Sequence, residues 1–292
     1  MIKKKKLQGK NLTNRQFYFK YLNKKKEDGS QITKEELYIL LEYANNYDQT
    51  TLIVNFDKNI KDENKIIRSL NELLKGRPIQ YIIGFVDFLG LNLNVKNVLI
   101  PREETKELCF ETVKLIKERK ISKDIIVDCC SGSGAIGLYL ESQFPLSKIF
   151  LIERFQKALK TLKNNVESLQ SKACILEGDF IKPLLENHIK CDVFICNPPY
   201  VKNKSDIALN VQKYEPMNAI YIKNNYYFYR KAFKEHSKFM NDKFLMAFEI
   251  NYDQEEQLIK IILEYFDKDV EYIFKLDSYG RKRFLFILGG YQ

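Results

Sequence analysis

Hydrophobic residues in the first third of the chain recur every three or four positions, which is the spacing of helices with one buried face. Thr33 and Glu36 stand three residues apart just before Leu37, Leu40 and Leu41, a pattern typical of a helix that begins with a capping box. A second stripe precedes a glycine and a proline that would end its helix: Ile66, Ile67, Leu70, Leu73, Leu74, Gly76 and Pro78. The pattern predicts a small helical domain over residues 1–80.

Residues 81–104 change to a period of two. Apolar side chains occupy alternate positions on both sides of Gly90: Phe85, Leu89, Leu91, Leu93 and Val95. Because alternate residues of a strand share one face, this segment is predicted to be a β-hairpin connector.

From about residue 105 onward, apolar runs of strand length alternate with amphipathic segments of helix length. Strands are expected at residues 125–128, 149–153, 173–177, 193–196, 244–250, 270–275 and 284–288, and helices at 105–118, 134–141, 156–169, 228–240 and 253–265. Such alternation is typical of a parallel sheet with helices on both faces. The predicted fold class is therefore α/β, with a seven-stranded Rossmann-like domain over residues 105–292.

The composition fits a packed globular chain. Of 292 residues, 45% are hydrophobic, and only 12 glycines and 7 prolines interrupt them. Apolar runs fall short of the roughly 18 residues that a membrane span needs. The start lacks the apolar segment of a signal peptide, and its lysines outnumber arginines, unlike those of a transit peptide. A cytoplasmic protein is expected, with import into an organelle as the alternative.

The positive charge is concentrated at the N-terminus. Residues 1–30 contribute +8 of the formal +10, because ten lysines and arginines there stand against only Glu27 and Asp28. This excess is interpreted either as a solvated basic terminus or as a surface that steers an acidic or RNA-associated partner.

The cysteines show no paired spacing of metal ligands. The six are Cys109, Cys129, Cys130, Cys174, Cys191 and Cys196, and only His188 and His236 could join them as ligands. Free thiols that pack as small hydrophobic residues are expected, with no metal cofactor.

The strand expected at residues 125–128 runs into a loop whose glycines, Gly132, Gly134 and Gly137, have G-x-G-x-x-G spacing. Such a loop brings bare backbone and a helix N-terminus against a ligand, and dinucleotides and S-adenosylmethionine both use it. Glu153, at the end of the next strand, is placed to hold the ribose hydroxyls of either cofactor. The predicted loop contacts are Cys130, Ser131, Gly132, Ser133 and Gly134, but the loop and Glu153 alone leave both cofactors open.

Two further acids favour S-adenosylmethionine. Asp128, just before the loop, is placed to receive the cationic amino group of the methionyl part, a position that a pyrophosphate would not favour. Asp179 follows the next strand and is placed to accept from the adenine amino group, with Phe180 beside the ring.

The strand expected at residues 193–196 ends in Asn197-Pro198-Pro199-Tyr200, an NPPY motif at the sheet edge where ligands bind in such folds. A planar NH2 nitrogen is a poor nucleophile because its lone pair is delocalised. The Asn197 side-chain oxygen and the Pro198 carbonyl can each accept one of its hydrogens. The two prolines stiffen the turn, and Tyr200 supplies a flat face over the acceptor group. The motif predicts methylation of a planar NH2 group, in either an amide or a base.

Most of the chain resembles the HemK/PrmC family, whose members methylate N5 of the glutamine in the Gly-Gly-Gln motif of class I peptide chain release factors. Similar blocks are residues 76–84, Phe88 with Gly90, residues 98–105, residues 197–200, residues 214–216, Glu249-Ile250 with Gln254, and residues 277–283. The resemblance implies a class I methyltransferase that acts in translation termination on release factors 1 and 2. It also implies that residues 1–80 bind the release factor. A monomer that needs no nucleic acid or membrane is expected, with S-adenosyl-L-homocysteine as the product.

The chain departs from the family pattern at several positions: Glu103, Lys106, Cys130 and residues 222–227. Three alternatives remain at this point. Glutamine methylation of ribosomal protein uL3 would use the same blocks, and adenine-N6 methylation of DNA or RNA would use the same NPPY motif. A binding protein that retains the fold without activity is the third.

Overall fold

The computed structural model describes residues 12–267 and 270–290, so five of the N-terminal lysines, Lys3, Lys4, Lys5, Lys6 and Lys10, lie outside it. The chain divides into two compact units. One comprises Met1–Phe85 with Leu209–Tyr214, and the other comprises Val86–Ala208 with Glu215–Gln292. Each is described by itself.

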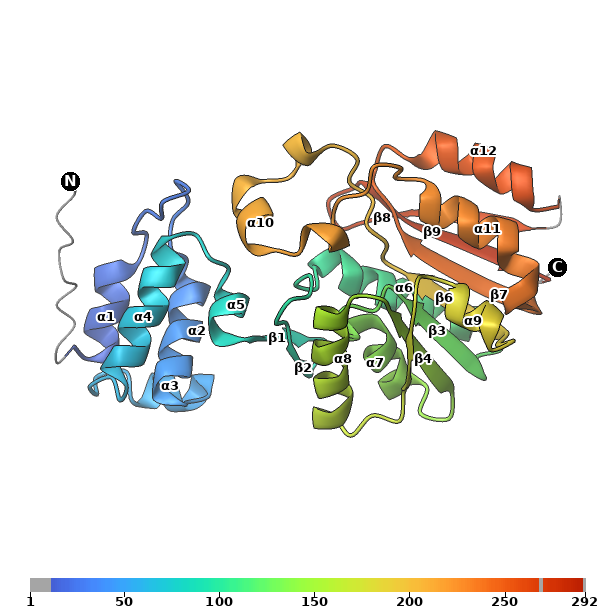
Figure 1. The fold of residues 1–292 in the computed structure, drawn as a ribbon. Coiled ribbons are helices and arrows are strands. Elements are labelled where there is room, and N and C mark those ends of the chain that lie inside the picture. Colours follow the sequence, from blue (N-terminus) through green and yellow to red (C-terminus); the bar gives the residue numbers. More distant parts are fainter. Residues whose placement is uncertain (1–11, 268–269, 291–292) are drawn as a thin grey trace. The chain divides into compact units, whose positions relative to one another are not determined.

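The first unit is helical, as the sequence predicts (Figure 1). Its helices are α1 (Asn14–Tyr21), α2 (Lys34–Asn45), α3 (Gln49–Val54), α4 (Glu63–Leu74), α5 (Ile79–Ile83) and α10 (Leu209–Tyr214). The capping box at the start of α2 is confirmed, because the Thr33 hydroxyl accepts from the Glu36 N–H while the Glu36 carboxylate accepts from the Thr33 N–H. The apolar stripes of α2 and α4 meet in one core that includes Leu37, Leu40 and Leu70.

The predicted hairpin consists of β1 (Phe85–Phe88) and β2 (Leu91–Asn94), which form a two-stranded sheet of their own. Leu89 and Gly90 between them both have positive φ, at 53° and 84°. A turn with two such residues matches the twist of a hairpin.

The second unit contains a seven-stranded sheet, as predicted, in the order β5-β4-β3-β6-β7-β9-β8. Its strands are β3 (Ile125–Cys129), β4 (Lys148–Glu153), β5 (Cys174–Glu177), β6 (Cys191–Cys196), β7 (Met240–Glu249), β8 (Glu271–Leu276) and β9 (Lys282–Gly289). Neighbours from β5 to β7 pair in parallel, and β9 is antiparallel to both β7 and β8. Because the chain order reverses between β3 and β6, a crevice is expected at their carboxyl ends.

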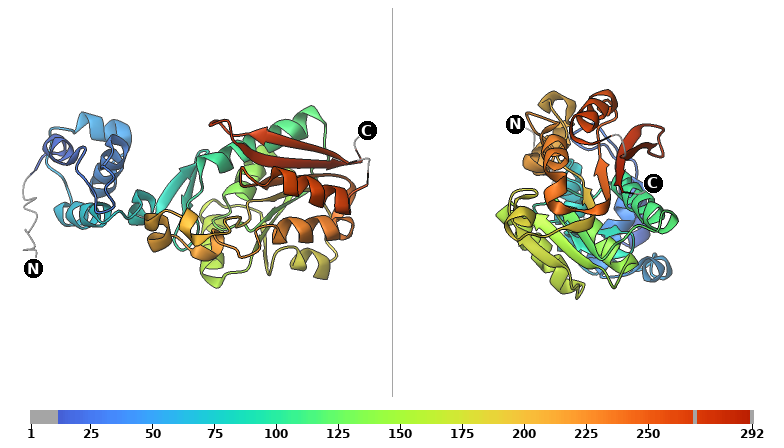
Figure 2. Two further views of the ribbon diagram at one scale, coloured as in Figure 1. Left: turned by 90° about the horizontal axis from the view of Figure 1, so that it is seen from above. Right: turned by 90° about the vertical axis from the view of Figure 1, so that its right-hand side faces the viewer.

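Helices cover both faces of this sheet (Figures 1 and 2). They are α6 (Glu103–Glu118), α7 (Ala135–Gln143), α8 (Gln156–Ser168), α9 (Lys182–Glu186), α11 (Tyr227–Phe239) and α12 (Glu255–Tyr265). In β3, Ile126 belongs to the core shared with α6 and α7, whereas Val127 and Cys129 belong to the core shared with α11 and α12. The strands are buried on both faces, which explains why they appear in the sequence as continuous apolar runs.

Strand ends differ from the prediction by up to four residues. The largest difference is at β7, which begins at Met240 instead of residue 244, because α11 ends at Phe239 and the chain passes directly into the strand. Among the described residues, no helix is long and apolar enough to cross a bilayer.

Candidate active site

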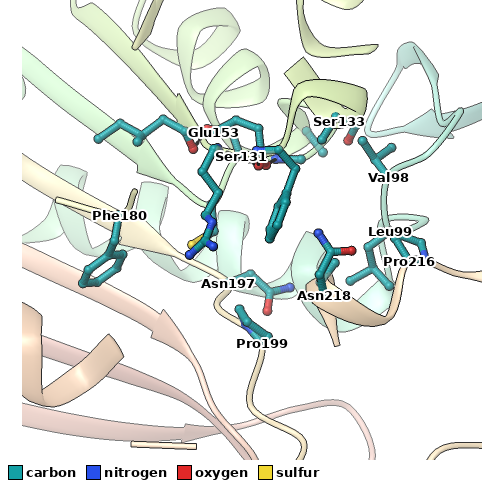
Figure 3. A pocket seen from close by; sticks show the side chains of 18 of the residues that line it. Val98, Leu99, Ser131, Ser133, Glu153, Phe180, Asn197, Pro199, Pro216 and Asn218 are labelled. Carbon is teal, nitrogen blue, oxygen red and sulfur yellow. Dashed lines mark hydrogen bonds between the residues drawn. The ribbon is translucent and has the colours of Figure 1, made fainter. Parts of the chain in front are cut away.

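A cavity of about 290 Å³ lies at the carboxyl ends of the central strands. Its wall is built by the loops after β3, β4, β5 and β6 and by two further segments, residues 97–101 and 216–222. Figure 3 shows Ser131 and Glu153 on one side of it, facing Asn197 and Pro199 on the other. The loops that carry the predicted site residues therefore converge on one cavity.

The loop after β3 lines the cavity through Cys130, Ser131, Gly132 and Ser133. Gly134 ends the loop with a φ of 83° and is the residue before α7. A Cβ at Gly134 would lie 2.7 Å from the Leu162 side chain, so this position also requires glycine for close packing. Gly134 is not among the described residues that line the cavity.

The Glu153 carboxylate is held in place by backbone donors. One oxygen accepts from the N–H of Gly132 at 3.0 Å, and the other accepts from the N–H groups of Arg154 and Phe155 at 2.7 and 2.8 Å. Burial raises the pKa of Glu153, and these bonds oppose the shift. The residue lines the cavity at the end of β4, where a carboxylate can accept from two vicinal hydroxyls.

Asp179 and Phe180 also line the cavity, but each has a second contact. Asp179 pairs with Arg154 at 2.9 Å, so an adenine amino group would share this carboxylate. Phe180 is 2% exposed and packs edge-on against Phe194 and Phe228 in the core. Phe155 lines the cavity as well and is 36% exposed, which makes it a flat surface that the sequence analysis missed. Its position two residues after Glu153 could have indicated it.

Asp128 lies beneath the glycine loop. Its Oδ2 accepts from the Gly137 N–H at 3.0 Å, while Oδ1 is buried without a hydrogen-bond partner among the described residues. Burial raises the pKa of Asp128 to about 8. Because Asp128 is not among the residues that line the cavity, a direct contact with a bound amino group stays a prediction. The unpaired oxygen shows that a donor would be favourable at this position.

Asn197 has its side-chain amide fixed by two residues that the sequence analysis did not assign to the site. Its Nδ2 donates to Glu249 Oε2 at 2.8 Å and to Thr105 Oγ1 at 3.1 Å, and the Thr105 hydroxyl donates to the same Glu249 oxygen at 2.8 Å. Burial raises the pKa of Glu249, and the bonds from Thr105 and Tyr200 oppose this rise. An ionised carboxylate only accepts hydrogen bonds, so the Asn197 NH2 group points toward it. The Asn197 carbonyl oxygen is thereby left for a ligand in the cavity.

The rest of the NPPY motif is divided between the cavity and the interior. Pro199 lines the cavity, whereas Pro198 is buried and Tyr200 is not among the lining residues. The Tyr200 hydroxyl donates to Glu249 Oε1 at 3.0 Å, and burial raises its pKa. Tyr200 therefore contacts the carboxylate that holds Asn197, and its predicted flat face over the acceptor remains a prediction.

A second ion pair holds the segments on the far side of the cavity together. Arg102 donates to Glu215 Oε1 at 2.5 Å, and the Glu215 side chain is almost fully buried. Their neighbours Pro101 and Pro216 both line the cavity. Both residues lie in sequence blocks that resemble the family, and no site role was predicted for them.

Family models match both units. Residues 21–84 match the PrmC N-terminal domain, and residues 95–250 match the family described as Conserved hypothetical protein 95. The release factor glutamine methyltransferase of Staphylococcus aureus (strain NCTC 8325 / PS 47) is 33% identical over 218 residues, which are 73% of this chain and 77% of that protein. That of Clostridium botulinum (strain Hall) is 34% identical over 231 residues, 76% of this chain and 81% of that protein.

Solved structures show the same fold at low identity. The hMettl16 catalytic domain in complex with the MAT2A 3′UTR hairpin 1 has a TM-score of 0.54 at 16% identity, covering 70% of this chain and 76% of that one. The delta-N METTL16 MTase domain has a TM-score of 0.51 at 15% identity, covering 78% and 97%. At these identities the likeness concerns the fold alone.

Together with the relatives named as methyltransferases, the strand order, the glycine loop before α7 and the held carboxylate at the end of β4 define a class I methyltransferase with S-adenosylmethionine as the methyl donor. The relatives make the assignment narrower. The chain belongs to the release factor glutamine methyltransferase family, so the resemblance seen in the sequence is confirmed.

Proposed function

We propose that this chain transfers a methyl group from S-adenosylmethionine to N5 of the glutamine in the Gly-Gly-Gln motif of class I release factors 1 and 2. The observation that carries the proposal is the fixed amide of Asn197, whose NH2 group is bound by Glu249 and Thr105. Its carbonyl oxygen is oriented to accept from an NH2 group, and the relatives that share most of the chain are named for glutamine methylation.

The loop residues Cys130 to Ser133 and Glu153 would hold the cofactor, because they line one side of the cavity opposite Asn197. Glu153 would accept hydrogen bonds from the ribose hydroxyls. The adenine would lie beside Asp179, Phe180 and Phe155. When bound, the cofactor supplies an electrophilic methyl group on a positively charged sulfur. The unpaired Asp128 Oδ1 would accept a hydrogen bond from the cationic amino group of the cofactor, which would have to approach it past the glycine loop.

The remaining work of the protein is to orient the acceptor. Asn197 and the Pro198 carbonyl would each accept one hydrogen of the glutamine NH2, which fixes the nitrogen in line with the methyl group. Among the cavity-lining residues, only Glu153 and Asp179 carry carboxylates, and both belong to the cofactor side. The nitrogen that has just accepted the methyl group is positively charged and acidic, so it can release its proton to water and the reaction does not require a base beside Asn197.

The division of labour between the parts is also proposed. Residues 1–80 bind the release factor, residues 81–104 connect, and residues 105–292 carry the reaction. The protein acts in the cytoplasm as a monomer and needs neither a metal ion nor nucleic acid. The two alternative acceptors, uL3 and adenine, are not favoured by the relatives, which are named for release factors.

The test is incubation of the purified chain with labelled S-adenosylmethionine and either release factor, followed by peptide mapping. One label on the Gly-Gly-Gln glutamine is expected. A release factor with that glutamine replaced by alanine is the matched control and should stay unlabelled. Purified uL3 and a nuclease-treated extract test the other acceptors. Labelling of uL3 alone, or labelling that nuclease abolishes, would overturn the proposal.

A further inference from the structure

Three cysteine side chains meet beside the cavity, although their spacing in the sequence gives no ligand pattern. The sulfurs of Cys129, Cys130 and Cys196 all lie within 4.8 Å of one another. Cys129 and Cys196 are register partners at the ends of the parallel strands β3 and β6, so their side chains share one face of the sheet. Both are fully buried in the aromatic core on the α11 side.

The backbone of Cys130 explains why it joins the pair. Successive side chains of a strand point to opposite faces, so a continued β3 would turn Cys130 away from Cys129. Instead Cys130 has a φ of 63°, in the left-handed region that non-glycine residues seldom adopt. This turn keeps its sulfur beside the other two. Cys130 is half-buried and lines the cavity, so one thiol can be reached from the cavity and two lie behind it.

The three thiols differ in reactivity. Hydrogen bonds from the Cys129 and Cys196 thiols lower the pKa of Cys130 well below its usual range. Burial raises the pKa values of Cys129 and Cys196 well above theirs. Because the thiolate is the nucleophile, Cys130 is the thiol that reacts first.

The surroundings favour a neutral product over a bound ion. Holding a metal would require several thiolates within an apolar cluster that includes Phe194 and Phe228, where charge is costly. A disulfide carries no charge, so it can be buried in this cluster without that cost in free energy. Cys130 and Cys129 are adjacent, so their Cα atoms are about 3.8 Å apart, which is below the usual range of disulfides. The partner of Cys130 in a disulfide is therefore Cys196.

We propose that Cys130 and Cys196 form an oxidation-sensitive pair whose disulfide distorts the cofactor side of the cavity. A peroxide is the oxidant. The Cys130 thiolate attacks one oxygen of hydrogen peroxide, the O–O bond breaks, hydroxide leaves, and Cys130 becomes a sulfenic acid. The Cys196 thiol then attacks this sulfur, water leaves with the thiol proton, and the Cys130–Cys196 disulfide forms. Two thiols are oxidised, and one peroxide is reduced to two molecules of water in total.

The bond would change the cavity through the loop. Joining the sulfurs at about 2.05 Å draws Cys130 toward β6 and carries Ser131 and Gly132 with it. Gly132 donates to Glu153, so the cofactor side loses its geometry. This link to activity rests on the proposed function, whereas formation of the disulfide does not.

The experiment uses the full chain, treated with limiting hydrogen peroxide, blocked with N-ethylmaleimide and mapped by mass spectrometry without reduction. A Cys130–Cys196 linked peptide is expected. Calorimetry with S-adenosylhomocysteine should show affinity falling at least about tenfold after oxidation and returning after dithiothreitol. In Cys196→Ala, the linked peptide should be missing and dimedone should label Cys130. Cys174→Ala, which changes a half-buried thiol outside the cluster, should behave as the unaltered chain.

Absence of the linked peptide from the oxidised, unaltered chain would overturn the proposal, and so would linkage of Cys130 to Cys129. This readout remains decisive if Cys196→Ala does not fold. A linked peptide in a protein that fails to bind S-adenosylhomocysteine before oxidation would support the disulfide and contradict the proposed cofactor site. The two failures are therefore distinguishable.

Discussion

The side-chain amide of Asn197 donates to the Glu249 carboxylate at 2.8 Å, across 52 residues of sequence. Glu249 is 2% exposed at the end of β7 and also accepts from Thr105 and Tyr200. One buried carboxylate therefore fixes the orientation of the group proposed to hold the substrate. Because both of its oxygens have donors, its position is set before any ligand binds.

Glu249→Ala is expected to lower kcat by about 10²- to 10³-fold, because Asn197 loses the partner that orients it. Glu249→Gln should recover most of this loss, since its oxygen can still accept from Asn197 while its NH2 faces the Tyr200 oxygen. Single-turnover rates and calorimetry with S-adenosylhomocysteine separate the two effects. An equal loss in both variants, or a matching loss of cofactor affinity, would show that Glu249 serves folding instead.

Asn197→Ala should reduce kcat by orders of magnitude while cofactor affinity stays nearly unchanged, because the side chain aligns the nucleophile and lies opposite the cofactor loop. Asn197→Asp is the matched variant. It retains an acceptor for the substrate but places a second carboxylate beside Glu249, so Asn197→Asp should be no more active than Asn197→Ala. Steady-state kinetics with release factor supply the measurement. A similar loss of affinity for the cofactor would contradict the assigned role.

The sheet was predictable because its strands are buried on both faces and appear as apolar runs, and Asn197 and Glu153 were predictable because each directly follows or ends such a run. Thr105 and Glu249 were not, since they reach Asn197 from 92 and 52 residues away through packing alone. The cysteine cluster depends on the register of β3 with β6 and on one left-handed residue. Neither leaves a periodic trace in the sequence.

Arg102→Ala should weaken turnover more than it weakens cofactor binding. It leaves the Glu215 carboxylate buried without its cation, and the other Glu215 oxygen already lacks a partner among the described residues. Because the Arg102 side chain is 37% exposed, its removal should cost less than the loss of a partner in a fully buried pair, about 1–3 kcal/mol, and the segment that carries Pro216 should move out of the cavity wall. Arg102→Lys keeps the charge and should lose less. Proteolysis near residue 216 and kcat/KM report the change; unaltered protection in Arg102→Ala would count against it.

Gly137→Ala tests the close approach of α7 to the sheet. Helix propensity alone would favour alanine by about 1 kcal/mol. A Cβ at this position, however, would lie 2.2 Å from the Leu151 side chain and 2.9 Å from Asp128 Cβ, both fully buried. The cost of overpacking, about 1–3 kcal/mol, should exceed the gain in helix propensity, so the free energy of unfolding should fall in Gly137→Ala and fall further in Gly137→Ser. Thermal unfolding of both variants decides the sign, and a rise in Tm for alanine would show that α7 can shift.

Asp128 should make the stability of the methyltransferase unit depend on pH. Burial raises its folded-state pKa to about 8, so the folded protein retains a proton that the unfolded chain releases near the usual value of about 4. The free energy of unfolding should therefore fall as pH rises from about 4 to 8 and level off above, by up to about 5 kcal/mol. Asp128→Asn keeps an acceptor for Gly137 but cannot titrate, so its curve should be flatter across this window.

The measurement is urea unfolding of both proteins without ligand. The transition of the methyltransferase unit is identified beforehand as the one that S-adenosylhomocysteine shifts. Parallel curves for the two proteins would mean that Asp128 is ionised in the folded state, with its free oxygen solvated.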